Sequence, residues 1–237
     1  LQDYFDQGYL QSSMINMLAR LGWSKGDKEI FYIDVLISDF SVELLPEAEQ
    51  TFVSCVGDRS VLESLKNTIF VESESTFQQF ISAYESPQEL GVDRFLVMIA
   101  SMDQYPNQTC LIVDAGSALT FDLVLADGKH KGGLIMPGLG VLRRSFKQFS
   151  SESKQLLLGQ SANNTTDAWE YGTAQMLMSV INEQINNYLN QYGDLQIILT
   201  GSDAKMIGIR LNQQTQIKPN LVLDGLALYA QVRAGLV

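Results

Sequence analysis

The apolar and polar positions of this 237-residue chain change period several times, as expected where helices alternate with strands. Helical spacing covers residues 8–22, and KEIFYIDVLI then has the pattern of a buried strand. A short strand, TFVSCVG, precedes a helix that starts near Asp58 or Ser60. Ser86-Pro87-Gln88-Glu89 has the form of a capping box, which predicts a helix from there to about Met102.

From Thr109 the pattern predicts an antiparallel meander of three strands. TCLIVDAG, LTFDLVLA and KHKGGLIMPG are separated by turns at Gly116-Ser117 and Asp127-Gly128. Helices are predicted at 138–149 and 165–191, with the polar stretch SSESKQ exposed between them. LQIILTG then predicts a strand, SDAKMIGIRL a helix, NLVLDG a short strand or extended segment, and LALYAQVRAG the closing helix.

Two distant segments have the same order of elements. FVSCVGDRSVLESL and IILTGSDAKMIGIRL both run from a strand through small residues and an acid into a helix. This echo favours two α/β lobes, 1–100 and 101–237, with a ligand bound between them.

Composition narrows the possible partners and the location of the chain. A formal charge of −11 and a pI near 4.5 oppose binding to nucleic acid or to an anionic membrane through a diffuse positive field. No apolar run approaches the roughly 18 residues of a spanning helix, and no secretory leader opens the chain. We therefore expect a cytoplasmic protein that holds any anionic ligand through local donors.

Histidine and cysteine counts limit the possible chemistry. The one histidine, His130, argues against multi-histidine metal sites and Ser-His-Asp catalysis, and its position beside lysines predicts an exposed strand residue. Cys55 and Cys110 lie in apolar strand-like runs, which is typical of reduced, buried thiols.

The sequence IVDAGSALTFD is a candidate phosphate site. Backbone N–H groups of Gly116 and Ser117 could face a phosphate where larger side chains would block its approach. Asp114 and Asp122, on consecutive strands near the turn, could hold a cation that screens the phosphate charge. The alternative is an ordinary hairpin whose turn needs glycine and whose two acids are solvated.

A second candidate site lies in the helix after the capping box. Asp93 could accept a hydroxyl proton, and Arg94 could clamp a carboxylate or a phosphate. As neighbours in a helix they are poorly placed for a mutual salt bridge. The alternative is a solvated charge pair, because most helix charges lie on exposed faces.

Two further stretches have a structural and a functional interpretation. Lys131–Gly138 places paired glycines and a proline around a short apolar strand, which indicates close backbone approach to another segment or to a ligand. Residues 162–165 precede a helix, so one of them could simply cap it.

Taken in order, these motifs resemble the type III pantothenate kinase family of the acetate kinase, sugar kinase, Hsp70 and actin superfamily. The resemblance runs from about residue 50 to the end. It rests on six motifs: Tyr84-x-x-Pro87 with Gly91-Val92-Asp93-Arg94; Asp114-Ala115-Gly116-Ser117-Ala118-x-Thr120-x-Asp122; Gly132-Gly133-x-Ile135-x-Pro137-Gly138; Asn163-Asn164-Thr165-x-x-Ala168-x-x-x-Gly172; Thr200-Gly201-x-Asp203-Ala204; and Leu223-Asp224-Gly225-Leu226.

The resemblance implies an actin-like, ribonuclease H-like duplicated two-lobed α/β fold with mixed sheets, and a homodimer. It implies transfer of the ATP γ-phosphate to pantothenate, the first step of coenzyme A biosynthesis, with Mg²⁺ and a monovalent cation such as K⁺ or NH₄⁺. The implied roles are the general base for Asp93, cation binding for Asp114, and ATP phosphate binding for Gly116 and Ser117. Pantothenate would be bound by Tyr84, Gly91, Val92, Asp93, Arg94 and Thr165.

Near its N-terminus the family carries a phosphate-binding loop, in which a strand ends in Asp-x-Gly-Asn-Thr/Ser. This chain departs from that pattern. The nearest match is 33–41, where Asp34 and Ser38 fit but Leu36 replaces the glycine, and no lysine or arginine follows. Either this loop is degenerate or the true first hairpin lies upstream of Leu1. Besides the kinase, a non-catalytic relative that binds ligands or a protein partner therefore stays open. A third possibility, another kinase or phosphatase of the superfamily, is disfavoured by GVDR and NNT.

Overall fold

The computed structural model describes residues 51–56 and 68–235. The predicted elements at 8–22, at KEIFYIDVLI and in DRSVLESL lie outside these residues. Residues 33–41, the nearest match to the family's first phosphate loop, also lie outside them. Within the described chain there are two compact units. The first comprises the chain up to Gln78, Tyr84–Ala100 and the chain from Asn220, whereas the second comprises Gln79–Ala83 and Ser101–Pro219. These units differ from the contiguous lobes 1–100 and 101–237, because the C-terminal helix packs with the first unit.

The first unit is built around an aromatic cluster. Its strands are β1 (Thr51–Val53), β2 (Thr68–Phe70) and β3 (Thr76–Phe77), and its helices are the 3-10 helix η3 (Pro87–Glu89), the greater part of α4 (Val92–Gln104), and α8 (Leu221–Arg233). Strands β1 and β2 are parallel. The Tyr229 ring of α8 lies 5.3 Å from Phe77 and 6.3 Å from both Phe52 and Phe95. Ring packing of this kind joins the strands to both helices.

The predicted capping box at Ser86 is wrong. Ser86 precedes only the three-residue η3, and its side chain makes no capping hydrogen bond. Leu90 is extended (φ −77°, ψ 119°), its side chain is 2 % exposed, and its carbonyl accepts a hydrogen bond of 2.7 Å from Ser73 Oγ. Burial and this bond hold Leu90 outside the helical conformation, so α4 begins at Val92.

The predicted extended segment NLVLDG is also wrong, because it forms the start of α8. Leu221, Leu223, Leu226 and Leu228 are all buried, so the helix is apolar on more than one face and its first turn resembles a strand in sequence. A Cβ at Gly225 would lie 2.1 Å from the Leu96 carbonyl oxygen. Glycine here allows α8 to pack directly on the backbone of α4.

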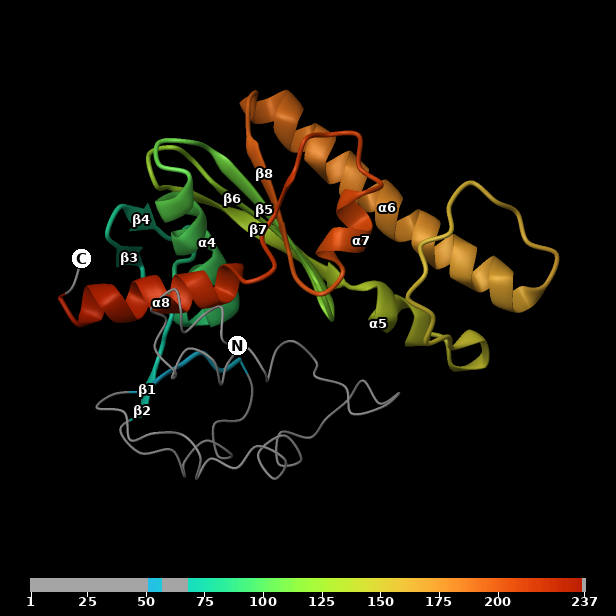
Figure 1. Cartoon of the computed structure of the whole chain (residues 1–237), viewed down its shortest axis with the longest axis horizontal. Coiled ribbons are helices and arrows are strands. Elements are labelled where there is room, and N and C mark those ends of the chain that lie inside the picture. Colours follow the sequence, from blue (N-terminus) through green and yellow to red (C-terminus); the bar gives the residue numbers. More distant parts are fainter. Residues whose placement is uncertain (1–50, 57–67, 236–237) are drawn as a thin grey trace, which may run out of the picture. The chain divides into compact units, whose positions relative to one another are not determined.

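The second unit contains a mixed five-stranded sheet in the order β7-β6-β5-β8-β9 (Figure 1). The strands are β5 (Cys110–Ala115), β6 (Ala118–Val124), β7 (His130–Pro137), β8 (Gln196–Thr200) and β9 (Gln216–Ile217). The predicted meander is confirmed, since β5, β6 and β7 are antiparallel, and β8 and β9 continue the sheet in parallel. This arrangement agrees with the predicted α/β class with mixed sheets and an actin-like, ribonuclease H-like fold.

Helices of the second unit cover one face of the sheet. They are α5 (Leu139–Arg144), the 3-10 helix η4 (Lys147–Phe149), α6 (Thr165–Tyr192) and α7 (Ala204–Gly208), and a short strand β4 (Phe80–Ile81) also belongs to this unit. The long α6 crosses the sheet (Figure 1) and shares one apolar core with alternate residues of β5, β6 and β8. The residues between them therefore point to the opposite face, where the candidate polar groups lie.

Both cysteines are free thiols, as predicted. Cys110 is buried on β5, and this burial raises the pKa of its thiol to about 12. Cys55 is only half-buried. Within the described part of the chain, no helix combines the length and the apolar character needed to cross a membrane.

Candidate functional site

The first group of predicted site residues lies around the start of α4, where Tyr84 contacts Arg94 and Gly91 lies beside Asp93. We call Tyr84, Gly91, Asp93 and Arg94 the acceptor cluster. The Arg94 side chain is 4 % exposed. Its Nη1 donates a hydrogen bond of 2.8 Å to the Tyr84 hydroxyl, and its guanidinium lies 5.6 Å from the centre of the Tyr84 ring. Both contacts fix the direction of Arg94, so the alternative of a solvated charge pair is wrong for this residue.

Asp93 lies half-buried in the first turn of α4. Its Oδ1 accepts a hydrogen bond of 2.8 Å from the Arg94 backbone N–H, and the N-terminal end of the helix favours a negative charge. A Cβ at Gly91 would lie 2.6 Å from the same oxygen. The carboxylate is therefore oriented by backbone, and the absence of a side chain at Gly91 leaves room for it.

Val92 differs from its neighbours, because it is buried in the core with 7 % of its surface exposed. Its predicted contact with pantothenate stays a prediction.

Two loops of the second unit converge on the Gly116-Ser117 turn, and we call residues 115–118, Gly138 and 200–203 the phosphate corner. The Gly138 N–H donates to the Ser117 carbonyl at 3.0 Å, and the Asp203 N–H donates to the Ala115 carbonyl at 2.9 Å. The Gly116 N–H donates to the Ala118 carbonyl at 2.9 Å, so it closes the turn. Ser117 is exposed, and its hydroxyl is the polar side-chain group that the turn presents.

Two glycines allow these loops to meet. A Cβ at Gly138 would lie 1.9 Å from the Gly116 carbonyl oxygen. A Cβ at Gly201, where φ is +90°, would lie 2.3 Å from the Ala115 carbonyl oxygen and 2.4 Å from Asp114 Oδ1. The close backbone approach predicted for KGGLIMPG is thus found at Gly138, which packs on the Gly116 backbone. At Gly132, by contrast, a Cβ would have no neighbour within 4 Å.

Asp114 lies beside this corner on the polar face of the sheet. In the sheet register it is paired with Thr120 of β6 and with Thr200 of β8, so the two threonine side chains flank it on the same face. Carboxylate, hydroxyl and carbonyl oxygens are the donors that hard cations prefer. Within the described residues, no group of three or more histidine, cysteine, aspartate or glutamate side chains could hold a metal ion.

Asp122 and His130 differ from their predicted settings. Asp122 is 1 % exposed and His130 4 % exposed, and His130 Nε2 lies 3.1 Å from Asp122 Oδ1. The prediction of an exposed His130 is therefore wrong. The alternative of two solvated acids is wrong for Asp122, while Asp114 is half-buried. His130 is paired with Val124 in the strand register, which places its side chain on the same face as Asp122.

Thr165 is exposed at the first position of α6. The adjacent Asn164 caps the helix, since its side chain accepts a hydrogen bond of 2.9 Å from the Asp167 N–H. The prediction that one of residues 162–165 caps the helix is confirmed. The predicted contact of Thr165 with substrate stays a prediction.

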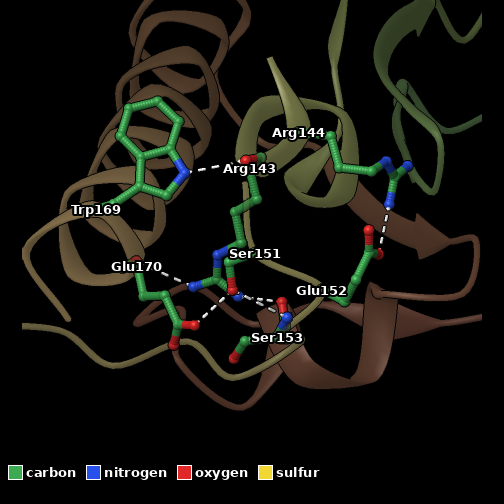
Figure 2. A network of polar contacts seen from close by, with 7 residues as sticks. All are labelled: Arg143, Arg144, Ser151, Glu152, Ser153, Trp169 and Glu170. Atoms are coloured by element: carbon green, nitrogen blue, oxygen red, sulfur yellow. Dashed lines mark hydrogen bonds and ion pairs between the residues drawn. The ribbon is translucent and has the colours of Figure 1, made fainter. Parts of the chain in front are cut away.

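Sequence reasoning missed Arg143, which is fully buried on α5. Its guanidinium donates to the backbone carbonyls of Ser153 and Glu170 (Figure 2). It also donates to the Gln155 carbonyl and to Thr173 Oγ1. Burial lowers the pKa of Arg143, and the charges of Glu170 and Asp203 oppose that change. The stretch SSESKQ has no buried residue, in line with the predicted exposure, and Arg143 links its Ser153 and Gln155 carbonyls to α6.

The family model and the individual relatives that match this chain belong to the same family. The family model described as type III pantothenate kinase matches residues 44–187. A type III pantothenate kinase from Pseudoalteromonas translucida is 33% identical over 186 residues, covering 73% of this chain and 77% of the relative. Another from Colwellia psychrerythraea is 34% identical over 220 residues, covering 81% of this chain and 88% of the relative.

One solved structure supports the fold. The crystal structure of a conserved protein of the Baf transcriptional activator family from Campylobacter jejuni aligns with a TM-score of 0.59, covering 87% of this chain and 90% of that chain. At 21% sequence identity, this likeness bears on the fold alone.

Proposed function

Because the chain belongs to the type III pantothenate kinase family, we propose that it transfers the γ-phosphate of ATP to pantothenate, the first step of coenzyme A biosynthesis. The observation that carries the residue assignment is the acceptor cluster, in which Arg94 is buried and oriented by Tyr84 while Asp93 stays partly accessible. A fixed cation beside an oriented carboxylate suits an acceptor that has both a carboxylate and a hydroxyl.

In the proposed reaction, Asp93 accepts the proton of the pantothenate hydroxyl as the hydroxyl oxygen attacks the γ-phosphorus of ATP. The bond from that phosphorus to the β–γ bridging oxygen breaks, and ADP leaves with the bonding electrons. The hydrogen bond from the Arg94 backbone N–H to Asp93 Oδ1 holds the carboxylate in one rotamer, which favours proton transfer from a fixed direction. Arg94 and Tyr84 bind the acceptor, with Gly91, Val92 and Thr165 as further proposed contacts. Phosphoryl transfer depends mainly on positioning and charge neutralisation, so a single base of this kind is sufficient.

The phosphate corner supports binding of ATP. Ser117 would donate its hydroxyl to a phosphate, and the closely packed glycines leave the turn free of bulky side chains. Asp114 and its flanking threonines fit a monovalent cation that would offset phosphate charge. Mg²⁺, which binds through one or two carboxylates together with substrate phosphates, belongs to the same proposal. A homodimer also belongs to this proposal.

A coupled ADP-release assay with pantothenate, ATP, Mg²⁺ and K⁺ tests the function. Asp93→Asn keeps the shape of the side chain but removes its basicity, so we expect kcat to fall by about 10²–10⁴. Asp103→Asn is a matched control, because Asp103 is exposed at the other end of α4, and it should keep full activity.

Two outcomes would contradict the proposal. Full activity of the Asp93→Asn variant would remove Asp93 as the base. If the wild type released no ADP but calorimetry still detected pantothenate binding, the alternative of a non-catalytic relative would be favoured. That alternative rests on the difference between residues 33–41 and the family's phosphate-loop pattern.

A further inference from the structure

We propose that the buried Asp122–His130 pair is a positioning device for pantothenate binding, because it anchors the segment that leads directly into Tyr84. The inference rests on the proposed function, in which Tyr84 belongs to the acceptor cluster. It adds two positioning residues that do not themselves touch substrate.

The segment in question is 79–83, which belongs to the second unit. The Ile81 N–H donates to the Gly128 carbonyl at 2.9 Å, and Ile81 also forms a parallel bridge with Lys129. A Cβ at Gly128 would lie 2.0 Å from the Gln79 carbonyl oxygen, so the turn between β6 and β7 packs directly on this segment. The backbone of 79–81 is thus held by the same turn that begins the strand carrying His130.

The His130 side chain continues this anchor towards Tyr84. Its ring stacks on Phe80, which is fully buried, with ring centres 6.1 Å apart. Its Nδ1 accepts a hydrogen bond of 3.5 Å from the Ala83 N–H, and Ala83 is the residue before Tyr84. An acceptor at Nδ1 places the ring proton on Nε2, where it faces Asp122 Oδ1 at 3.1 Å. Asp122 therefore selects the tautomer that can hold Ala83.

Tyr84 is the next residue along the chain, and its hydroxyl orients Arg94. Release of the Ala83 N–H would loosen the backbone from which the Tyr84 side chain extends. A displaced Tyr84 would leave Arg94 less well oriented for the carboxylate of the acceptor. The expected consequence is weaker pantothenate binding with ATP binding unchanged.

Two variants separate this role from a purely structural one. In His130→Gln the terminal amide reaches the position of Nε2, so the contact with Asp122 is kept while the acceptor for Ala83 is lost. In His130→Asn the terminal amide lies near the position of Nδ1, so the Ala83 contact is kept while Asp122 loses its partner at Nε2. Lys131→Gln, at the exposed neighbouring position, is the control.

The measurements are hydrogen exchange of a peptide covering 79–84, the pantothenate and ATP KM values, and the thermal midpoint of unfolding. We expect about fivefold faster exchange and about fivefold higher pantothenate KM in His130→Gln, with little change in its midpoint. His130→Asn should have the lower midpoint but nearly wild-type exchange and KM.

Pantothenate KM values that follow the thermal midpoints of the two variants would overturn the positioning role, because structural damage alone would then explain them. Unchanged exchange in His130→Gln would overturn the anchor itself, whatever the activity. Faster exchange in that variant, in a protein that neither releases ADP nor binds pantothenate, would support the anchor and reject the proposed function.

Discussion

The acceptor cluster depends on side chains held by single hydrogen bonds, whereas in the phosphate corner the backbones of three loops pack directly on one another. Arg94 depends on the Tyr84 hydroxyl, and Asp93 is held by a neighbouring backbone N–H. In the corner, Gly138 and Gly201 approach carbonyl oxygens so closely that a Cβ would overlap them. Substitutions in the first group should therefore change binding with little cost to folding, while substitutions at the glycines of the second should affect folding first.

The largest effect is expected for Gly201→Ala. Its positive φ and the overlap with the Ala115 carbonyl should together lower the free energy of unfolding by about 3 kcal/mol. Gly132→Ala is a matched control, because Gly132 also has a positive φ (+87°) but a Cβ there would have no neighbour within 4 Å. Only backbone strain, about 1–2 kcal/mol, should therefore lower its free energy of unfolding. Urea unfolding followed by circular dichroism compares the two. Equal losses would show that close packing at Gly201 contributes nothing.

A smaller effect, on binding alone, is expected for Arg94→Lys. Lysine keeps the charge but cannot reproduce the planar guanidinium that contacts both the hydroxyl and the ring of Tyr84. The pantothenate KM should rise about tenfold, and the ATP KM should not change. Tyr84→Phe removes only the hydroxyl and should raise the pantothenate KM about threefold. A larger effect of Tyr84→Phe than of Arg94→Lys would contradict the role of Tyr84 as the residue that orients Arg94.

The sequence predicted the parts of the fold that depend on local patterns. The Asp127-Gly128 turn between alternating apolar runs correctly indicated the meander, and the residues before α6 correctly indicated a cap. The start of α4 was misplaced, because Leu90 is held extended by a tertiary hydrogen bond from Ser73 that no local pattern reveals. The start of α8 was misread because its apolar residues face more than one neighbour.

The motifs GVDR and DAGS lie in the acceptor cluster and the phosphate corner, and their roles stay predictions, but the sequence did not show which polar groups near them are buried. His130 was detectable in principle, since Lys129 and Lys131 are exposed and strand alternation places the residue between them on the opposite face. Arg143 was not detectable, because Arg143 and Arg144 are adjacent and only the fold decides which is buried. Its partners are backbone carbonyls, which leave no signal in the sequence.

The proposal that the acceptor cluster binds pantothenate and the phosphate corner binds ATP is tested most directly by calorimetry. Each ligand is titrated into the Arg94→Lys and Ser117→Asp variants. Ser117 is exposed, so aspartate can be accommodated there while its charge opposes a phosphate. We predict that Arg94→Lys weakens pantothenate binding about tenfold and leaves the ATP Kd within about twofold, and that Ser117→Asp does the reverse. If each variant weakened both ligands equally, the assignment of pantothenate to the acceptor cluster and of ATP to the phosphate corner would be wrong.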